Sequence, residues 1–174
     1  MNETLKAMRE RRSTRKFKPD AVPRELIEQV VDAGLWAPSG MNRQSPIIVA
    51  VTNKQLRDRL SEVNRAIGGW DESFDPFYGA PVVLVVLART EAPTYLYDGS
   101  LAMGNMLLAA HTLGLGSCWI HRAKEEFATG EFKALLAELG VEGDYEGIGH
   151  CILGYIDKET PAQPRKDDRV FWVE

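Results

Sequence analysis

The chain has 174 residues, of which 44% are hydrophobic and 26% charged, and its formal net charge is -4, which suits one globular domain over residues 1–174. No apolar run approaches the ~20 residues of a membrane-spanning helix and no signal-type stretch precedes the first charges, so we expect no membrane partner. Two cysteines are too few for a disulfide framework and agree with a reducing compartment, so we expect a cytoplasmic protein without a nucleic-acid partner.

The expected elements form a mixed α and β chain. Apolar residues at helical spacing predict helices, and short apolar runs bounded by turn residues predict strands. The helices are expected over residues 3–12, 23–36, 53–64, 98–113 and 129–139. The strands are expected over residues 46–52, 81–89, 115–121 and 146–155.

Positive charge gathers where the first expected helix ends. We call residues 9–18 the cationic segment, because they contain six basic side chains and one acid, Glu10. Arg11, Arg12, Ser13 and Arg15 lie at its centre. Guanidinium groups bind phosphate oxygens bidentately, and a hydroxyl adds a further hydrogen bond. The segment is therefore either a phosphate site or a solvated charged face.

A polar loop follows the second expected helix. Residues 37–44 read Ala-Pro-Ser-Gly-Met-Asn-Arg-Gln, and Pro38 ends the helix. Ser39, Gly40 and Asn42 bring backbone and side-chain groups that can hold the edge of a flat polar heterocycle. The alternative is a plain turn between a helix and a strand, built from turn-favouring residues.

Two later segments carry unusual apolar character. The helix that includes residues 100–112 is apolar on nearly all sides, so it must be enclosed, and a subunit interface is a natural way to enclose it. Residues 68–81 are irregular and rich in aromatic side chains. We expect them to pack against a ligand, a partner subunit or their own core.

Three other chemistries fit the sequence poorly. Cys118, His121, His150 and Cys151 resemble a zinc ligand set, but strand alternation would point them to opposite faces of a sheet. The glycines near the C-terminus do not follow the order of a dinucleotide-binding fold. No nucleophile, base and orienting acid can be assigned as a set.

The two polar motifs together resemble the start of the FMN-dependent nitroreductase family. These motifs are a helix ending in Arg-Arg-Ser-x-Arg-x-Phe and, about twenty residues later, a helix ending in Ala-Pro-Ser-Gly-x-Asn-x-Gln. The later parts are similar to the family's core strand at 82–88, its central helix at 104–108 and its flavin-contacting strand end at 113–121. The basic tail at 164–166, followed by residues 170–172, resembles the family's C-terminal element.

The resemblance implies an α+β fold with a mostly antiparallel central sheet flanked by helices. It also implies a buried central helix and a homodimer in which the C-terminal segments are exchanged, although that segment could instead be tucked onto its own domain. The implied activity is ping-pong transfer of a hydride from NADH or NADPH, through FMN, to a small conjugated acceptor such as a nitroaromatic or a quinone. The alternative is a flavin-binding or redox-responsive homodimer, or a specialised flavin enzyme without nitroreductase activity.

The resemblance also assigns roles to residues. Arg11 and Ser13 would hold the FMN phosphate with help from Arg12, and Arg165 or Lys166 would reach it from the tail. Arg15 would face the pyrimidine edge of the flavin, where a cation stabilises reduced flavin. The loop along the ring and the ribityl chain would consist of Pro38, Ser39, Gly40 and Asn42. The strand end at the ring would consist of Trp119, Ile120 and His121, and for Ile120 ordinary core packing stays open as an alternative.

The chain departs from the family pattern in three places. Ser45 follows Gln44 where a proline is usual, so the entry to the strand differs. His121 and Arg122 stand where an acid or a glycine is common, and they would either steer an anionic substrate or simply be exposed. The chain is short between residues 88 and 101, which predicts a more open pocket. We nevertheless expect the cationic segment and the polar loop to hold one mononucleotide jointly, with no catalytic side chain and no metal.

Overall fold

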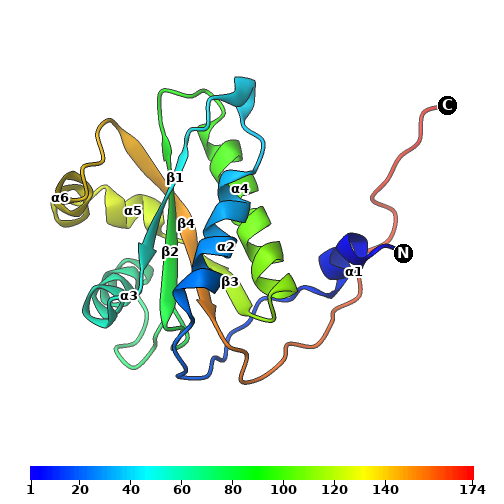
Figure 1. Cartoon of the computed structure of the whole chain (residues 1–174), viewed down its shortest axis with the longest axis horizontal. Helices are drawn as coiled ribbons and strands as arrows, with labels where there is room; N and C mark the ends of the chain where they lie inside the picture. The colour runs from blue at the N-terminus through cyan, green and yellow to red at the C-terminus, as the bar shows by residue number, and fades with distance from the viewer.

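The computed structural model describes all of residues 1–174 (Figure 1). A short 3₁₀ turn, η1 (Gly40–Asn42), follows the second helix. The helices are α1 (Glu3–Glu10), α2 (Arg24–Leu35), α3 (Lys54–Gly68), α4 (Tyr95–Thr112), α5 (Ala123–Phe127) and α6 (Gly130–Glu138). The strands are β1 (Pro46–Val51), β2 (Val82–Arg89), β3 (Gly116–Ile120) and β4 (Tyr145–Gly154).

The four strands form one antiparallel sheet in the order β1-β2-β4-β3. β2 and β4 are therefore central, and β1 and β3 are the edges. The register between β2 and β4 shifts where Val86 pairs with Gly149 but the next residue pairs with Gly147, which leaves Ile148 as the extra residue of a bulge. Ile148 packs closely on α4, and Gly99 makes this possible because a Cβ there would lie 2.5 Å from Ile148 Cγ1.

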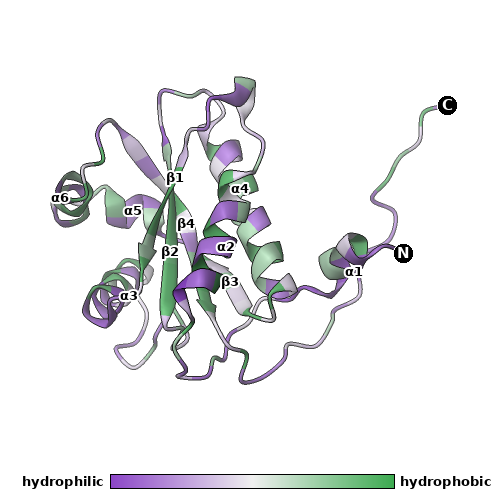
Figure 2. Cartoon of the chain, viewed as in Figure 1, coloured by the Kyte–Doolittle hydropathy of each residue, from purple (hydrophilic) through white to green (hydrophobic).

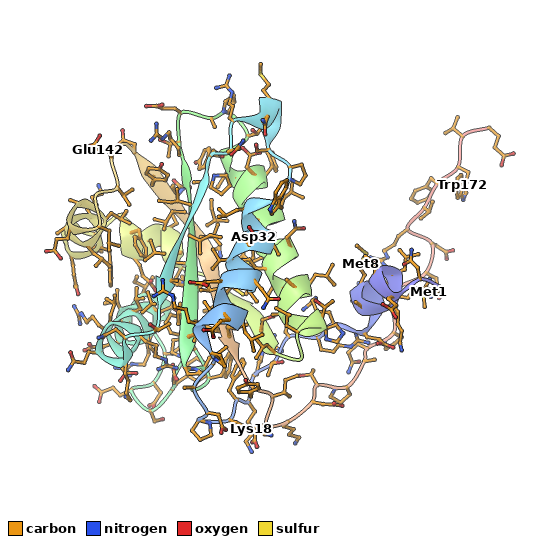
Figure 3. The ribbon with its side chains drawn as sticks, in the orientation of Figure 1. Met1, Met8, Lys18, Asp32, Glu142 and Trp172 are labelled. Carbon is orange, nitrogen blue, oxygen red and sulfur yellow. The ribbon has the colours of Figure 1, made fainter.

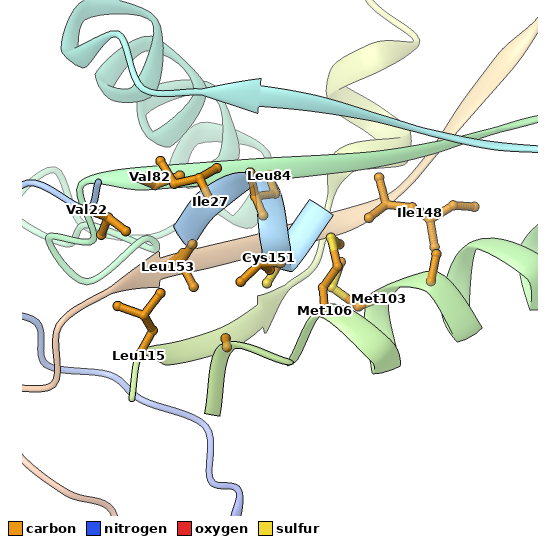
Figure 4. Packing of buried hydrophobic residues seen from close by; sticks show 14 of the residues in the cluster. Val22, Ile27, Val82, Leu84, Met103, Met106, Leu115, Ile148, Cys151 and Leu153 are labelled. Carbon is orange, nitrogen blue, oxygen red and sulfur yellow. The ribbon is translucent and has the colours of Figure 1, made fainter. Parts of the chain in front are cut away.

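Helices cover both faces of the sheet (Figure 1). α2 and α4 pack on one face, and α3, α5 and α6 lie on the other. Successive strand residues point to opposite faces, so Leu84 and Val86 of β2 join the core beneath α2 and α4 (Figure 4), whereas Val83 and Val85 join the second core. A strand buried on both faces reads as a continuous apolar run, which is the pattern that predicts β2.

Local sequence signals explain where several helices begin and end. The Asn2 side chain accepts a hydrogen bond from the Leu5 N–H at 2.9 Å and caps α1. The Asn53 side chain caps α3 in the same way. α3 ends at Gly68, and the next residue, Gly69, has a φ of 66°, a left-handed conformation that suits glycine.

Each predicted helix and strand is present, and the α+β expectation is confirmed. The main boundary differences are that α1 ends earlier, at Glu10, α3 continues to Gly68, and α4 begins at Tyr95. No pattern in the sequence indicates α5, because five residues carry too little periodicity. Its apolar residues, Ala123 and Phe127, are buried against the sheet.

The aromatic segment that follows α3 covers its own domain. Phe77 is fully buried, and Trp70, Phe74 and Tyr78 pack edge to face with ring centroids 5.4 and 5.7 Å apart. The Asp75 carboxylate holds the turn by accepting a hydrogen bond from the Phe77 N–H at 2.9 Å. Phe77 thus covers the core, and contact of this segment with a ligand or a partner subunit stays a prediction.

Both ends of the chain project from the body (Figure 1). α1 buries no residue, and residues 161–174, which we call the tail, are all exposed. The tip of the tail is hydrophobic, as its green parts in Figure 2 show, and Phe171 and Trp172 are 86% and 83% exposed. No helix of the chain combines the length and hydropathy needed to cross a bilayer. The apolar tail therefore has no covering surface within one chain.

Candidate functional site

The cationic segment runs along the β3 edge of the sheet. The Thr14 N–H donates to the Ser117 carbonyl at 2.9 Å, and Ser13 pairs with Ser117 in a parallel bridge. The Thr160 hydroxyl, from the start of the tail, donates to the Ser13 carbonyl at 2.9 Å. Gly116 permits this close approach, because a Cβ there would lie 2.6 Å from Thr14 Oγ1. These contacts fix the cationic segment beside β3.

Arg11 lies half-buried at this edge. Its N–H donates to the Ala7 carbonyl at 2.9 Å and ends α1. Its Nη1 atom is buried and has no hydrogen-bond partner. Burial raises the pKa of the Cys151 thiol to about 12, and the charge of Arg11 opposes that shift. Because an unpartnered buried guanidinium nitrogen is unfavourable, the position fits an anionic ligand such as a phosphate.

The other basic residues predicted for this site differ in their surroundings. Arg12 folds back on its own helix, where Nη1 donates to two carbonyls at 2.5 and 2.8 Å. Arg165 returns from the tail and lines a cavity of about 450 Å³ together with Arg9 and Arg12. Arg15 and Lys166 are exposed. The structure thus gathers basic side chains from two distant parts of the chain at one place.

The polar loop lies beside the first turns of α4. The Gly40 N–H donates to Asp98 Oδ1 at 3.0 Å. A Cβ at Gly40 would lie 2.2 Å from Thr94 Oγ1, so glycine is required for this approach. Pro38 is exposed and stands three residues beyond the end of α2.

Three residues of the polar loop have strained backbone. Met41, Asn42 and Gln44 have φ values of 54°, 53° and 49°, in the left-handed region that side chains rarely adopt. The Gln44 N–H donates to Ser39 Oγ at 2.9 Å, and the Gln44 side-chain amide donates to Asn42 Oδ1 at 3.3 Å. Such strain persists only where the surroundings hold it, and it is frequent at ligand sites.

Asp98 holds this loop, and the motif reasoning misses it. Its carboxylate is buried and also accepts hydrogen bonds from the Ser45 hydroxyl at 2.8 Å and the Thr94 hydroxyl at 3.1 Å. Burial raises the pKa of Asp98, but the hydrogen bonds from Gly40, Ser45 and Thr94 outweigh it, so the pKa lies below its ordinary value. The sequence offers one signal for this residue, because Asp98 is an acid inside an otherwise apolar helix. Ser45, the departure from the family pattern, is thus an anchor of the strand entry.

Replacing Asp98 by Asn should lower the free energy of unfolding by about 1.5–3 kcal/mol, because hydrogen bonds to a charged acceptor are lost. The Asp98 pKa is depressed by folding, so its stabilisation is present above the unfolded-state value of about 3.9 and is lost as the pH falls through the folded-state pKa. The free energy of unfolding, measured with urea, should therefore fall less between neutral pH and about pH 3 in Asp98→Asn than in the wild type. Asp32→Asn, at an exposed position of α2, is the control. Equal stability of the two variants at neutral pH would contradict the anchoring role.

The third predicted group lies at the end of β3. Trp119 is 36% exposed, and its indole lies over Gly149, where a Cβ would be 2.1 Å from Nε1. Ile120 is half-buried and packs against the core beside α3. The His121 side chain is exposed, while its carbonyl accepts a hydrogen bond from the Asn64 side-chain amide at 2.8 Å.

Arg122 and His121 differ in their surroundings. The Arg122 guanidinium donates to Glu125 Oε1 at 3.0 Å, and the φ of this residue is 82°. Arg122 therefore forms an ion pair within its own chain, whereas His121 stays exposed.

The cationic segment and the end of β3 share one edge of the sheet, but the polar loop lies at the other end of α4. Asp98 holds the loop, and His111, thirteen residues later, lines a cavity of about 520 Å³ together with Arg12 and Ser117. At 1.5 Å per residue, this stretch of helix is about 20 Å long. Figures 1 and 3 show the same separation, with η1 at the top of the view and Lys18 near the bottom. Within one chain the two motifs do not meet, so their joint binding of one mononucleotide stays a prediction, and it requires a second copy of the chain.

The comparisons with known proteins agree with this geometry. The model of the Nitroreductase family matches residues 8–155. A crystal structure of a nitroreductase with bound FMN from Bacteroides fragilis superposes with a TM-score of 0.91 over 100% of both chains, at 28% identity. A protein of Archaeoglobus fulgidus, provisionally named NADH dehydrogenase/NAD(P)H nitroreductase, is 30% identical over 175 residues, which cover 97% of this chain and 94% of that protein.

A protein of Methanothermobacter thermautotrophicus with the same provisional name is 32% identical over 126 residues. The match covers 67% of this chain and 60% of the length of that protein. The match to the family model spans most of the chain, from α1 to the end of β4. The chain belongs to the nitroreductase family.

Proposed function

We propose that the chain is an FMN-dependent oxidoreductase that uses NADH or NADPH to reduce a small conjugated acceptor, such as a nitroaromatic or a quinone. The observation that carries the proposal is the buried, unpartnered Arg11 Nη1 on a segment fixed to the β3 edge. The phosphate of FMN offers the anionic oxygens that this nitrogen lacks. The FMN bound by the structurally similar Bacteroides fragilis protein supports the same choice of ligand.

The proposed contacts are those that the resemblance to the family assigns. Arg11 and Ser13 bind the phosphate, with Arg12 beside them and with Arg165 or Lys166 added from the tail. Arg15 faces the pyrimidine edge of the ring, where its charge favours the reduced form. The residues along the ring and the ribityl chain are Trp119, Ile120 and His121 at the end of β3, and Pro38, Ser39, Gly40 and Asn42 in the polar loop.

The chemistry that FMN supplies when bound is transfer of a hydride from NADH or NADPH to the acceptor, in two successive half-reactions at one place. Neither half-reaction requires a side-chain acid or base, which suits a site with no such pair. The protein binds and orients the ligand and sets the charge around it. Arg11 and Arg15 supply positive charge, and the strained loop supplies a rigid wall.

We propose that the site is completed by a second copy of the chain, because the polar loop of one copy is far from its own cationic segment. The surface around the loop is unusually apolar. Trp36 at the end of α2 is 79% exposed, and Tyr97 and Leu101 on α4 are 71% and 48% exposed. Several large apolar side chains exposed near one loop favour an interface over a free surface. The outer side of α4, which the sequence requires to be enclosed, is covered in this arrangement.

We propose further that the tails are exchanged in this homodimer. β1 is an edge strand that pairs only with β2, and an open edge is a template for a further strand. A cavity of about 610 Å³ follows this edge and is lined by apolar side chains that include Ile47, Val49, Leu139 and Tyr145. The exposed apolar tip of the tail matches that lining, and strand addition satisfies its backbone.

An anaerobic titration tests the activity. The purified protein, loaded with FMN and freed of excess ligand, should show the absorption bands of oxidised flavin. Addition of NADH or NADPH should bleach these bands, and a nitroaromatic or a quinone added afterwards should restore them. These two steps, followed in one cuvette, separate the half-reactions.

The outcomes separate an NAD(P)H-dependent reductase from a flavin-binding protein without that activity. A yellow protein that bleaches and recovers supports the reductase. A yellow protein that ignores both nicotinamides would instead support a flavin-binding or redox-responsive homodimer, or a flavin enzyme of another kind. A protein that binds no FMN at any concentration would overturn the proposal.

A further inference from the structure

A buried polar network lies behind the end of β3. Asn64 of α3, Glu126 of α5 and His150 of β4 are each 0% exposed. His150 Nε2 lies 2.8 Å from Glu126 Oε2, and the Asn64 amide donates to Glu126 Oε1 at 2.6 Å. Phe77 packs against the His150 ring, with centroids 5.2 Å apart. Three elements that are distant in the sequence therefore meet in one set of hydrogen bonds.

The network reaches the backbone of the strand end. The Asn64 amide also donates to the His121 carbonyl at 2.8 Å, and His150 Nδ1 lies 3.4 Å from the Ile120 carbonyl. The next carbonyl, that of Arg122, accepts the Glu126 N–H at 3.1 Å. The carbonyls of Ile120 and His121 are therefore directed toward the network, and the Arg122 carbonyl is held by the first backbone bond of α5.

The direction of the carbonyls sets the direction of the N–H groups. In a planar trans peptide, the carbonyl of one residue and the N–H of the next point in opposite directions. The His121 N–H therefore points away from His150, and the Arg122 N–H points away from Asn64. Neither N–H donates to an acceptor of the chain. Two successive free donors are thus directed away from the buried network at the end of β3, the edge strand beside which the cationic segment lies.

Burial of a carboxylate and an imidazole is unfavourable, and apolar side chains of the same size would pack at a lower cost. The presence of this network therefore favours a role beyond stability. The strained Arg122, with a φ of 82°, lies directly at its border. We infer that Asn64, Glu126 and His150 are positioning residues, which hold the peptides of residues 120–122 so that the His121 and Arg122 N–H groups face the flavin ring. This inference rests on the proposed function. It assigns a role to three residues that do not touch the ligand.

The inference predicts an altered flavin potential with an unaltered phosphate contact. Outward N–H dipoles stabilise negative charge on the reduced ring, so Asn64→Ala and His150→Phe should each weaken the preference for reduced flavin at least tenfold. For a two-electron couple, this lowers the midpoint potential by about 30 mV. The ratio of the affinities for FMN and riboflavin, which differ in the phosphate, should stay as in the wild type. His150→Gln, which keeps one donor toward Glu126, should restore most of the potential.

Ser61→Ala is the matched control. Ser61 is also a buried polar residue of α3, but it donates to Asp75 at 2.6 Å and does not reach β3. It should lower stability without moving the potential. A potential within a few millivolts of the wild type in FMN-loaded Asn64→Ala and His150→Phe would overturn the inference, as would an equal shift in Ser61→Ala.

A second measurement needs no flavin. In amide hydrogen exchange of the ligand-free protein, the Glu126 N–H, which donates to the Arg122 carbonyl, should exchange at least tenfold faster in Asn64→Ala than in Ser61→Ala. If Asn64→Ala does not fold, Glu126→Gln replaces it, because it keeps the shape but removes one acceptor. Unchanged exchange refutes the positioning role whatever the ligand. Faster exchange in a protein that binds no FMN would support the network while refuting the proposed function.

Discussion

A chain that ends at Lys166 is expected to be monomeric and to lose FMN, although each residue proposed to contact the ligand is still present. The deletion removes the apolar tip of the tail, in which Phe171, Trp172 and Val173 are almost fully exposed. Full burial of one large apolar side chain contributes about 1.5–3 kcal/mol. Loss of this tip should weaken the dimer roughly a thousandfold or more. Analytical ultracentrifugation over a range of concentrations, with absorbance at the flavin band, measures both effects together.

Two full-length variants separate the apolar contact from chain length. Phe171→Ser combined with Trp172→Ser should reproduce the deletion, because it keeps the backbone and removes the apolar surface. Asp167→Asn combined with Asp168→Asn should leave the dimer intact. If the shortened chain remains a dimer that keeps its FMN, the exchanged tail is not what holds the subunits together.

Replacing Arg11 by Ala should weaken FMN binding tenfold or more, because a charge-assisted contact to the phosphate contributes about 1.5–3 kcal/mol. The affinity for riboflavin, which has no phosphate, should not change. The ratio of the two affinities therefore isolates the phosphate contact from any general damage to the site. The FMN affinity of Arg11→Lys should lie between those of the wild type and Arg11→Ala, because lysine keeps the charge but lacks the planar guanidinium fork. Fluorescence titration of the apoprotein with each flavin gives both constants.

Lys54→Ala is the matched control for removal of a positive charge. Lys54 lies on α3, on the face of the sheet opposite α4, and its side chain is 87% exposed. It should leave both affinities as they are. If Arg11→Ala weakens FMN and riboflavin equally, Arg11 supports the fold of the segment instead of binding the phosphate. If it weakens neither, the phosphate lies elsewhere.

The site could be predicted from the sequence only where its residues are close neighbours in the chain. The cationic segment and the polar loop each span about ten residues, so composition and spacing reveal them. Asn64 and Glu126 are single polar residues within helices, and nothing around them in the sequence marks them as buried. Asp98 has one weak signal, its position as an acid inside an otherwise apolar helix. The roles of all three depend on partners that are more than fifty residues away, as the bonds from Asp98 to Gly40 and from Asn64 to Glu126 show.

The sequence by itself determined the helices, the strands, the two polar motifs and the family. These features are local, because side-chain periodicity, capping residues and turn residues act over a few positions. The bulge at Ile148 and the short α5 are consequences of packing between layers, and they leave no comparable pattern.

Only the tertiary structure decided how the motifs are arranged. It places the cationic segment beside β3 and the polar loop at the other end of α4, with about 20 Å of helix between Asp98 and His111. It also directs the carbonyls at the end of β3 into a buried network, which leaves two N–H groups facing outward. The physical reason is that distances between remote segments follow from how helices pack on the sheet, and no local pattern of residues encodes that packing.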